Sequence, residues 1–244
     1  MPEGLAIEVR EEFNHVMVRL TGQLSLRTIP RVRQITTKSL LGAGRVIINV
    51  TGLYSFKAAF VTVFPAALDA SGGWPSARLV LFGADARLRS MLVSGRIADM
   101  VPLAADLASA VEILEVRPPQ VRCHRDLPFC NTAPSVARML VRTACDAWLL
   151  PSTAREIAEL ACTELVTNAV EHAGSSSRLT LTCTRSALRV AVRDYCPAPV
   201  PRPRPIDVNT LYGRGLHLVV CLGQAWGVEQ HPDGKTVWVS LPLD

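Results

Sequence analysis

The pattern of hydrophobic and polar positions changes character near residue 115. Before that point, short apolar runs alternate with longer segments of helical period. The short runs predict strands at 15–20, 45–50 and 77–82. The longer segments predict helices at 26–41, 57–70, 86–94 and 103–114. Apolar strands that alternate with helices are typical of an α/β sandwich, in which the helices cover the sheet.

Beyond that point, the helical segments come first and the strands follow. Helices are predicted at 133–149 and 152–173, strands at 178–185 and 188–194, a further helix at 215–225, and closing strands at 227–231 and 236–241. Asp233-Gly234 is predicted to form the hairpin turn between the last two strands. Helices grouped on one face of a largely antiparallel sheet make an α+β sandwich. The paired prolines at 118 and 119 indicate a linker, so we expect two domains, 1–117 and 118–244.

Composition and charge narrow the classes of partner. The net charge of +5 is spread along the chain without a basic stripe, so we expect no nucleic-acid partner. The first residues lack a signal-peptide pattern, and the most apolar stretch, 58–68, contains Pro65 and is too short to span a bilayer. We therefore expect a cytoplasmic protein without a membrane partner. The seven cysteines form no C-x-x-C pair, which favours reduced thiols over a zinc site.

Three polar residues are spaced by four within the predicted helix 152–173. Glu164, Asn168 and His172 would stack on one side of a mostly apolar helix. Burying a carboxylate, an amide and an imidazole is costly unless each finds a partner. Taken alone, this spacing fits a solvated polar face as well as it fits a site.

Two later motifs favour a nucleotide site. Asp194 ends a predicted strand, with Pro197 three residues on, and its carboxylate can accept a hydrogen bond from the adenine amino group, which guanine lacks. Gly213-Arg214-Gly215-Leu216 opens a predicted helix, where glycines and free N–H groups suit phosphate oxygens.

The closing strand contributes Gly234-Lys235-Thr236, in which we expect Thr236 to assist at the adenine. Lys235 and Arg214 are candidates for neutralising phosphate charge, although a solvated surface position explains Lys235 better. Two other glycine motifs fail: a dinucleotide fingerprint needs glycine where Leu218 stands, and a Walker loop needs glycine where Glu229 stands.

Taken in order, these motifs resemble the GHKL ATP-binding fold over residues 120–244, and more narrowly the actinobacterial anti-sigma-factor serine kinases. The resemblance implies ATP and Mg²⁺ as cofactors. It implies that Asn168 helps to hold Mg²⁺, that Asp194 binds adenine, and that Glu164 is the general base. Gly213 and Gly215 would flank a lid over the phosphates. The other motif residues expected at the nucleotide are His172, Pro197, Arg214, Leu216 and Thr236.

Residues 1–117 resemble a STAS domain, the fold of anti-anti-sigma factors. The resemblance rests on the order of elements, on Leu20-Thr-Gly22-Gln-Leu24-Ser, and on the turn Ile48-Asn49-Val-Thr51-Gly52-Leu. In that family, a serine shortly after the turn is phosphorylated by the partner kinase. Here the corresponding stretch is Lys57-Ala58-Ala59-Phe60, which has no hydroxyl group. We therefore expect this domain not to be a substrate of its own kinase half.

The resemblances together imply a protein serine kinase that acts in trans on a STAS-domain antagonist and sequesters a sigma factor. They also imply a homodimer. The alternative is a nucleotide-gated binding switch without significant kinase activity, in which the STAS-like half is a docking or pseudo-substrate module. The sequence leaves this choice open.

Overall fold

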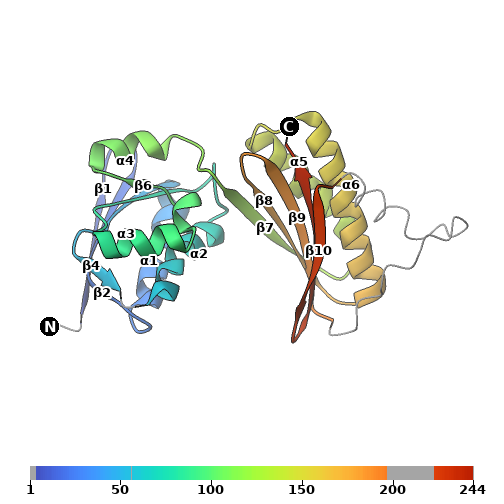
Figure 1. Ribbon diagram of the computed structural model, residues 1–244, viewed down its shortest axis with the longest axis horizontal. Coiled ribbons are helices and arrows are strands. Elements are labelled where there is room, and N and C mark those ends of the chain that lie inside the picture. The colour runs from blue at the N-terminus through green and yellow to red at the C-terminus, as the bar shows by residue number, and fades with distance from the viewer. Residues whose placement is uncertain (1–3, 56, 197–222, 244) are drawn as a thin grey trace, which may run out of the picture. The chain divides into compact units, whose positions relative to one another are not determined.

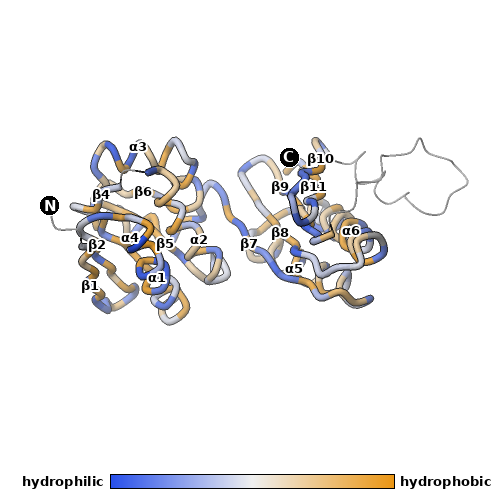
Figure 2. The backbone as a smooth tube through the Cα atoms, turned by 90° about the horizontal axis from the view of Figure 1, so that it is seen from below, coloured by the Kyte–Doolittle hydropathy of each residue, from blue (hydrophilic) through white to orange (hydrophobic). Residues whose placement is uncertain are grey.

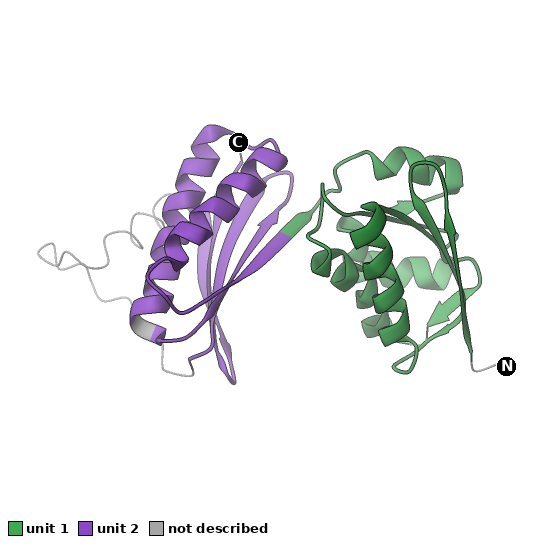
Figure 3. Cartoon of the chain, turned by 180° about the vertical axis from the view of Figure 1, so that it is seen from behind, with its two compact units in different colours: residues 1–122 green, residues 123–244 purple. Residues whose placement is uncertain are grey.

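The computed structural model describes residues 4–55, 57–196 and 223–243, apart from the side chain of His172. The chain divides into two compact units, Met1–Arg122 (unit 1) and Cys123–Asp244 (unit 2) (Figure 3). The division falls inside strand β7 (Val121–Leu127), whereas the sequence placed a boundary after residue 117.

Unit 1 is built on a mixed sheet with the strand order β1-β2-β3-β5-β6, in which β4 also pairs with β2. Strand β1 is antiparallel to β2, and the other pairs are parallel. The strands are β1 (Leu5–Glu11), β2 (Val16–Leu24), β3 (Arg45–Asn49), β4 (Leu53–Ser55), β5 (Arg78–Phe82) and β6 (Leu103–Ala104). The helices are α1 (Ile29–Ala43), η1 (Ala58–Thr62), α2 (Val63–Ala70), α3 (Ala86–Ser94), η2 (Ile97–Asp99) and α4 (Leu107–Leu114).

Helices bury both faces of this sheet. Alternate residues of β3 point to opposite sides: Val46 and Ile48 join the core formed with α1, α2 and α3, and Ile47 joins a second core. In that second core, Ala110 and Leu114 of α4 are buried. Burial on both sides explains why the central strands are continuously apolar rather than alternating. The predicted α/β sandwich is confirmed.

Unit 2 is an antiparallel sheet with two long helices on one face (Figure 1). The strand order is β10-β11-β9-β8-β7, which makes β9 the central strand, with β11 and β8 on either side of it. Its elements are β7, α5 (Ala133–Ala147), α6 (Ser152–Asn168), the π-helix η3 (Ala169–Ala173), β8 (Ser177–Cys183), β9 (Ala187–Asp194), β10 (Ala225–His231) and β11 (Gly234–Pro242). The predicted α+β sandwich is confirmed, while most of the predicted helix 215–225 lies outside the described residues.

The two faces of this sheet differ in composition. The face under α5 and α6, here called the helix face, buries Leu179 and Leu181 of β8 and Val190 and Val192 of β9. The residues that alternate with these along each strand point to the other side, here called the arginine face, which includes Arg178, Arg189 and Arg193. The two helices are amphipathic, and hydrophobic and hydrophilic residues alternate along both in Figure 2.

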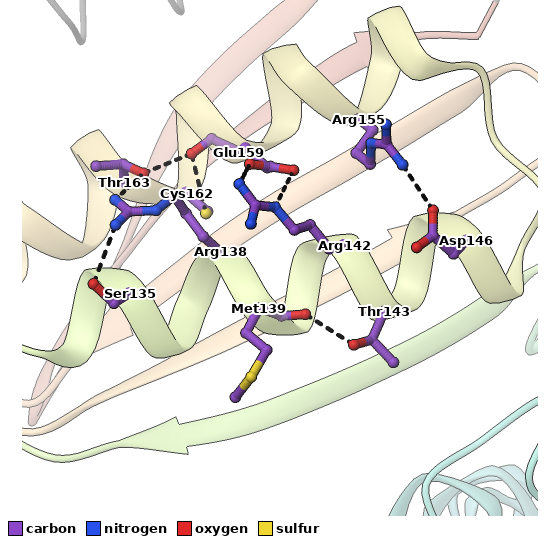
Figure 4. A network of polar contacts seen from close by, with 10 residues as sticks. All are labelled: Ser135, Arg138, Met139, Arg142, Thr143, Asp146, Arg155, Glu159, Cys162 and Thr163. Carbon is purple, nitrogen blue, oxygen red and sulfur yellow. Dashed lines mark hydrogen bonds and ion pairs between the residues drawn. The ribbon is translucent and has the colours of Figure 1, made fainter.

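Charged side chains join α5 to α6 along their outer edge (Figure 4). The guanidinium of Arg142 donates two parallel hydrogen bonds of 2.8 Å to the carboxylate of Glu159. This bidentate contact lowers the pKa of Glu159 below its ordinary value. Arg155 pairs with Asp146 at 2.9 Å, one turn nearer the loop between the helices.

Candidate functional site

Glu164 and Asn168 lie on α6 beside its buried stripe. They are four residues apart in α-helical backbone, so their side chains share one side of the helix. Both are half-buried, whereas their neighbour Leu165 is fully packed. Among the described residues, neither side chain has a hydrogen bond or an ion pair to another side chain. Within the described ranges, their polar groups are thus left for a ligand or for solvent.

The helix changes form immediately after Asn168. Residues Ala169–Ala173 are π-helical, and Gly174 ends the segment with a left-handed φ of 60°. Wide π-helical turns recur at functional sites because they displace the groups that follow. The backbone of His172 lies within this turn, so the predicted stacking by four applies to Glu164 and Asn168 only.

The end of this π-helix and Asp194 lie at the same end of the sheet. Only Gly174–Ser176 separate η3 from β8, whose first residue, Ser177, pairs with Asp194. The hydroxyl of Ser175 accepts a hydrogen bond of 3.2 Å from the backbone N–H of Tyr195. Both α6 and η3 also pack against β9. The sequence-predicted Asn168 and Asp194 therefore belong to one region of unit 2.

Asp194 is 3% exposed and has two partners among the described residues. Its Oδ1 accepts a hydrogen bond of 3.2 Å from the backbone N–H of Cys196, and its Oδ2 is 3.0 Å from Nζ of Lys235. Lys235 is itself only 8% exposed. The expectation of a solvated surface position for Lys235 is wrong.

The hairpin between β10 and β11 explains why Lys235 is buried rather than solvated. Its two-residue loop is Pro232–Asp233, and His231 pairs with Gly234, so β11 begins at the glycine that was predicted to turn. A Cβ atom at position 234 would overlap the backbone carbonyl of Asp194, so this close approach requires glycine. The register then places Lys235 directly opposite Asp194.

The same register moves Thr236 to the arginine face. Thr236 pairs with Arg193, and successive residues of a strand point to opposite faces. Its hydroxyl lies 2.9 Å from Nε2 of His231. Thr236 therefore lies on the face opposite to the Asp194 side chain, and Lys235 occupies the place expected for it. The predicted residues Pro197, Gly213, Arg214, Gly215 and Leu216 lie outside the described residues.

The residues present fit a magnesium nucleotide better than a metal ion alone. Within the described ranges, no group of three His, Cys, Asp or Glu side chains is placed to hold a metal. Mg²⁺ commonly takes one or two protein oxygens together with phosphate oxygens and water. The amide oxygen of Asn168 suits that arrangement, provided that a phosphate supplies the other ligands.

In unit 1, the predicted phosphoacceptor position begins a short 3₁₀ helix. Lys57 is extended and precedes η1, whose first residues are Ala58 and Ala59. Ser55 is 3% exposed, and its hydroxyl donates a 3.0 Å hydrogen bond to the carbonyl of Lys57. Thr62, at the end of η1, donates to the carbonyl of Ala59 at 2.7 Å. The nearest serine is therefore buried and the predicted acceptor position has no hydroxyl.

One family of known proteins matches a region that lies within unit 2. Residues 130–241 match the family described as histidine kinase-like ATPase domain. A comparison with curated proteins finds no match. None of the described helices is both long and apolar enough to cross a membrane.

Solved structures of regulators also resemble parts of the chain. An anti-sigma factor antagonist from Mycobacterium paratuberculosis is 13% identical over 48% of this chain and 98% of its own, with a TM-score of 0.43. An anti-sigma-factor antagonist (STAS) domain protein from Planctomyces limnophilus is 15% identical over 44% of this chain and 96% of its own, with a TM-score of 0.39.

A third similar structure contains the RsbU and RsbW domains of a Mycobacterium tuberculosis protein. It is 17% identical over 50% of this chain, with a TM-score of 0.39, and the match covers only 32% of its length. Because all three TM-scores are below 0.5, these likenesses say nothing of activity. The fold and the matched family together give the outcome: the chain joins a mixed α/β unit to a second unit in which residues 130–241 match the histidine kinase-like ATPase domain family.

Proposed function

We propose that this protein is an ATP-binding regulator of the anti-sigma type, which phosphorylates a serine of a separate STAS-domain antagonist and sequesters a sigma factor. The observation that carries the proposal is the meeting of α6, η3 and the end of β9 at one end of the unit 2 sheet. That meeting occurs inside the region that matches the ATPase family.

In this proposal, each residue has a distinct task at the nucleotide. The carboxylate of Asp194 accepts a hydrogen bond from the adenine amino group. The amide oxygen of Asn168 helps to hold Mg²⁺ against the phosphates. Glu164, one helical turn before Asn168, orients the attacking hydroxyl group and accepts its proton. Phosphoryl transfer depends mainly on such positioning and on neutralising charge, which Mg²⁺ supplies when bound.

The structure of unit 1 supports an acceptor serine on a separate protein. Unit 1 offers Lys57, Ala58 and Ala59 at the acceptor position, and its nearby Ser55 is buried. A buried hydroxyl that is hydrogen-bonded within its own domain cannot reach an ATP γ-phosphate without local unfolding. We therefore assign to unit 1 the task of docking or of acting as a pseudo-substrate.

A phosphotransfer assay with radiolabelled ATP and candidate STAS-domain proteins tests the proposal. Wild-type protein should label a serine of its partner, and Glu164→Ala and Asn168→Ala should each lose most of this activity, by a factor of about 100 or more. Glu156→Ala is the matched control, because Glu156 is an exposed glutamate two turns earlier on the same helix. Equal activity in Glu164→Ala and in the control would remove Glu164 from the mechanism.

The second candidate is a nucleotide-gated switch that binds its partner without transferring phosphate. The missing hydroxyl at positions 57–60 favours it, because no acceptor accompanies the ATPase domain in this chain. Measured ATP binding together with no transfer to any STAS partner would favour the switch. A stoichiometric phosphate within residues 50–62 after incubation with Mg-ATP, located by mass spectrometry, would instead make unit 1 a substrate in cis.

A further inference from the structure

Lys235 is a buried cation beside the residue that we assign to adenine. Its ammonium group lies on the helix face, and Asp194 is its only ion-pair partner among the described residues. An ammonium group has three N–H donors, and Oδ2 of Asp194 accepts only one of them. A buried lysine is costly when, as among the described residues, some of its donors have no acceptor, so this position favours a ligand that supplies one.

Asp194 also keeps capacity for a ligand. A carboxylate offers about four lone-pair sites, and the N–H of Cys196 and the ammonium of Lys235 use two of them. The two side chains therefore present a hydrogen-bond acceptor directly next to a hydrogen-bond donor. Adenine presents the complementary pair along one edge, where the N6 amino group is a donor and the adjacent N1 is an acceptor.

We propose that Lys235 is a specificity-determining residue of the nucleotide pocket, which donates to N1 of adenine while Asp194 accepts from the N6 amino group. This inference rests on the proposed ATP binding. Guanine presents the two groups in the opposite order, with an acceptor at O6 and a donor at N1. The Lys235–Asp194 pair therefore recognises the adenine edge by two contacts, whereas Asp194 alone would provide one.

The backbone fixes this pair in place. Glycine at position 234 allows β11 to approach the carbonyl of Asp194, and the ladder then sets Lys235 opposite Asp194. Strand β11 is paired on both sides, by β9 and β10, so a slip of its register would break both ladders. The donor and the acceptor are thus held before a base arrives, which lowers the entropy cost of recognition.

The first arm of the test uses the wild-type full chain and titrates three nucleotides by calorimetry. They are ATP, an ATP analogue in which C–H replaces N1, and a purine riboside triphosphate that lacks the N6 amino group. We expect each analogue to bind about tenfold more weakly or worse, because each forfeits a charge-assisted hydrogen bond. No binding of ATP would refute the proposed function itself. Tight ATP binding with equal affinity for the N1-substituted analogue would overturn the assignment of Lys235 alone.

The second arm is a double-mutant-type cycle of binding affinities, in which wild type and Lys235→Met are each titrated with ATP and with the N1-substituted analogue. If Lys235 donates to N1, the variant and the analogue remove the same contact, so their combined loss should hardly exceed either single loss. Additive losses would mean that Lys235 acts only through the fold, and would overturn the proposal. Ser240→Ala, on the arginine face of the same strand, is the control and should bind all three nucleotides as wild type does. The first arm needs no variant, so the proposal stays testable if Lys235→Met does not fold.

Discussion

The two faces of the unit 2 sheet carry ion pairs of similar length in opposite surroundings. On the helix face, Asp194 and Lys235 are 3.0 Å apart with side chains 5% and 11% exposed. On the arginine face, Arg178–Asp126, Arg189–Glu229 and Arg193–Asp233 are 2.6–2.7 Å apart, and every side chain is at least 33% exposed. The distance between the charged atoms therefore does not tell how much each pair contributes to stability. When one residue of a buried pair is removed, the charge of the other stays away from water and destabilises the fold. When one residue of an exposed pair is removed, the charge of the other is simply solvated.

Stacking adds a second difference. The guanidinium of Arg189 lies 4.2 Å from the ring centroid of Trp238, and that of Arg193 lies 5.4 Å from the ring of Tyr195. The arginines thus cover aromatic surface on a face that the two helices leave free, and their apolar stems contribute along with their charge. On the helix face, apolar side chains surround the Asp194–Lys235 pair, the one ion pair that the described residues place there, which favours a functional role for it.

The largest expected effect comes from breaking the buried pair. Lys235→Met should destabilise unit 2 by about 3 kcal/mol or more, because it leaves the carboxylate of Asp194 buried without its cation. Chemical denaturation monitored by tryptophan fluorescence measures this loss. Glu229→Ala is the matched change on the arginine face and should cost less than about 1 kcal/mol. Equal losses would abolish the distinction between the two faces.

Removing both charges should reverse most of that loss. Asp194→Leu combined with Lys235→Met replaces a buried ion pair with apolar groups, a change that is often neutral or stabilising. We expect the double variant to unfold within about 1 kcal/mol of wild type and yet to bind no ATP. Denaturation and calorimetry on the same sample check both points. A double variant as unstable as Lys235→Met would show that packing, not charge, makes the position sensitive.

A smaller effect, dependent on pH, is expected on the arginine face. The hydrogen bonds from Arg178 hold the pKa of Asp126 below its usual value. A carboxylate whose pKa is depressed by folding stabilises the protein above its unfolded pKa, and this contribution is lost as pH falls through the folded pKa. Asp126→Asn should therefore flatten the decline of Tm below about pH 4. Added salt should reproduce part of this change in wild type, and no change in slope would contradict the assignment.

The smallest expected effect is at Thr236. Because its side chain points to the arginine face, Thr236→Val should leave the affinity for ATP within about twofold of wild type. The same titration on Lys235→Met should show a loss of about tenfold or more. A large loss in Thr236→Val would mean that the nucleotide reaches the arginine face, and would support the role at the adenine predicted for Thr236 from the sequence.

Much of the fold was predictable because its signals are local. The apolar runs of β3 and β5 and the amphipathic period of α5 and α6 each lie within one segment, and they decide the fold class. Strand β7 was missed because Val-Arg-Cys-His-Arg-Asp-Leu places charged residues where a covered strand would be apolar. The predicted helix 57–70 is instead η1 followed by α2.

The site was less predictable because it depends on register. Glu164 and Asn168 follow from helical spacing, and Asp194 from its position at the end of a strand. The choice between Lys235 and Thr236 depends on whether the hairpin loop ends before or after Gly234, since one residue changes the face. The Asp-Gly signal predicted a turn at residues 233 and 234, whereas the turn is at residues 232 and 233. A lysine in a strand also usually indicates a side chain that points to solvent.

The two-residue loop Pro232–Asp233 gives this site an unusual evolutionary constraint. A point substitution on β11 changes one side chain on one face of the sheet. A one-residue insertion or deletion in the loop would instead turn every side chain of the strand to the opposite face. Lys235 would then point to solvent, and Trp238 would enter the core beneath the helices. Loop length in this hairpin should therefore be inherited as strictly as the residues that contact a ligand, although the loop itself contacts none of the proposed nucleotide groups.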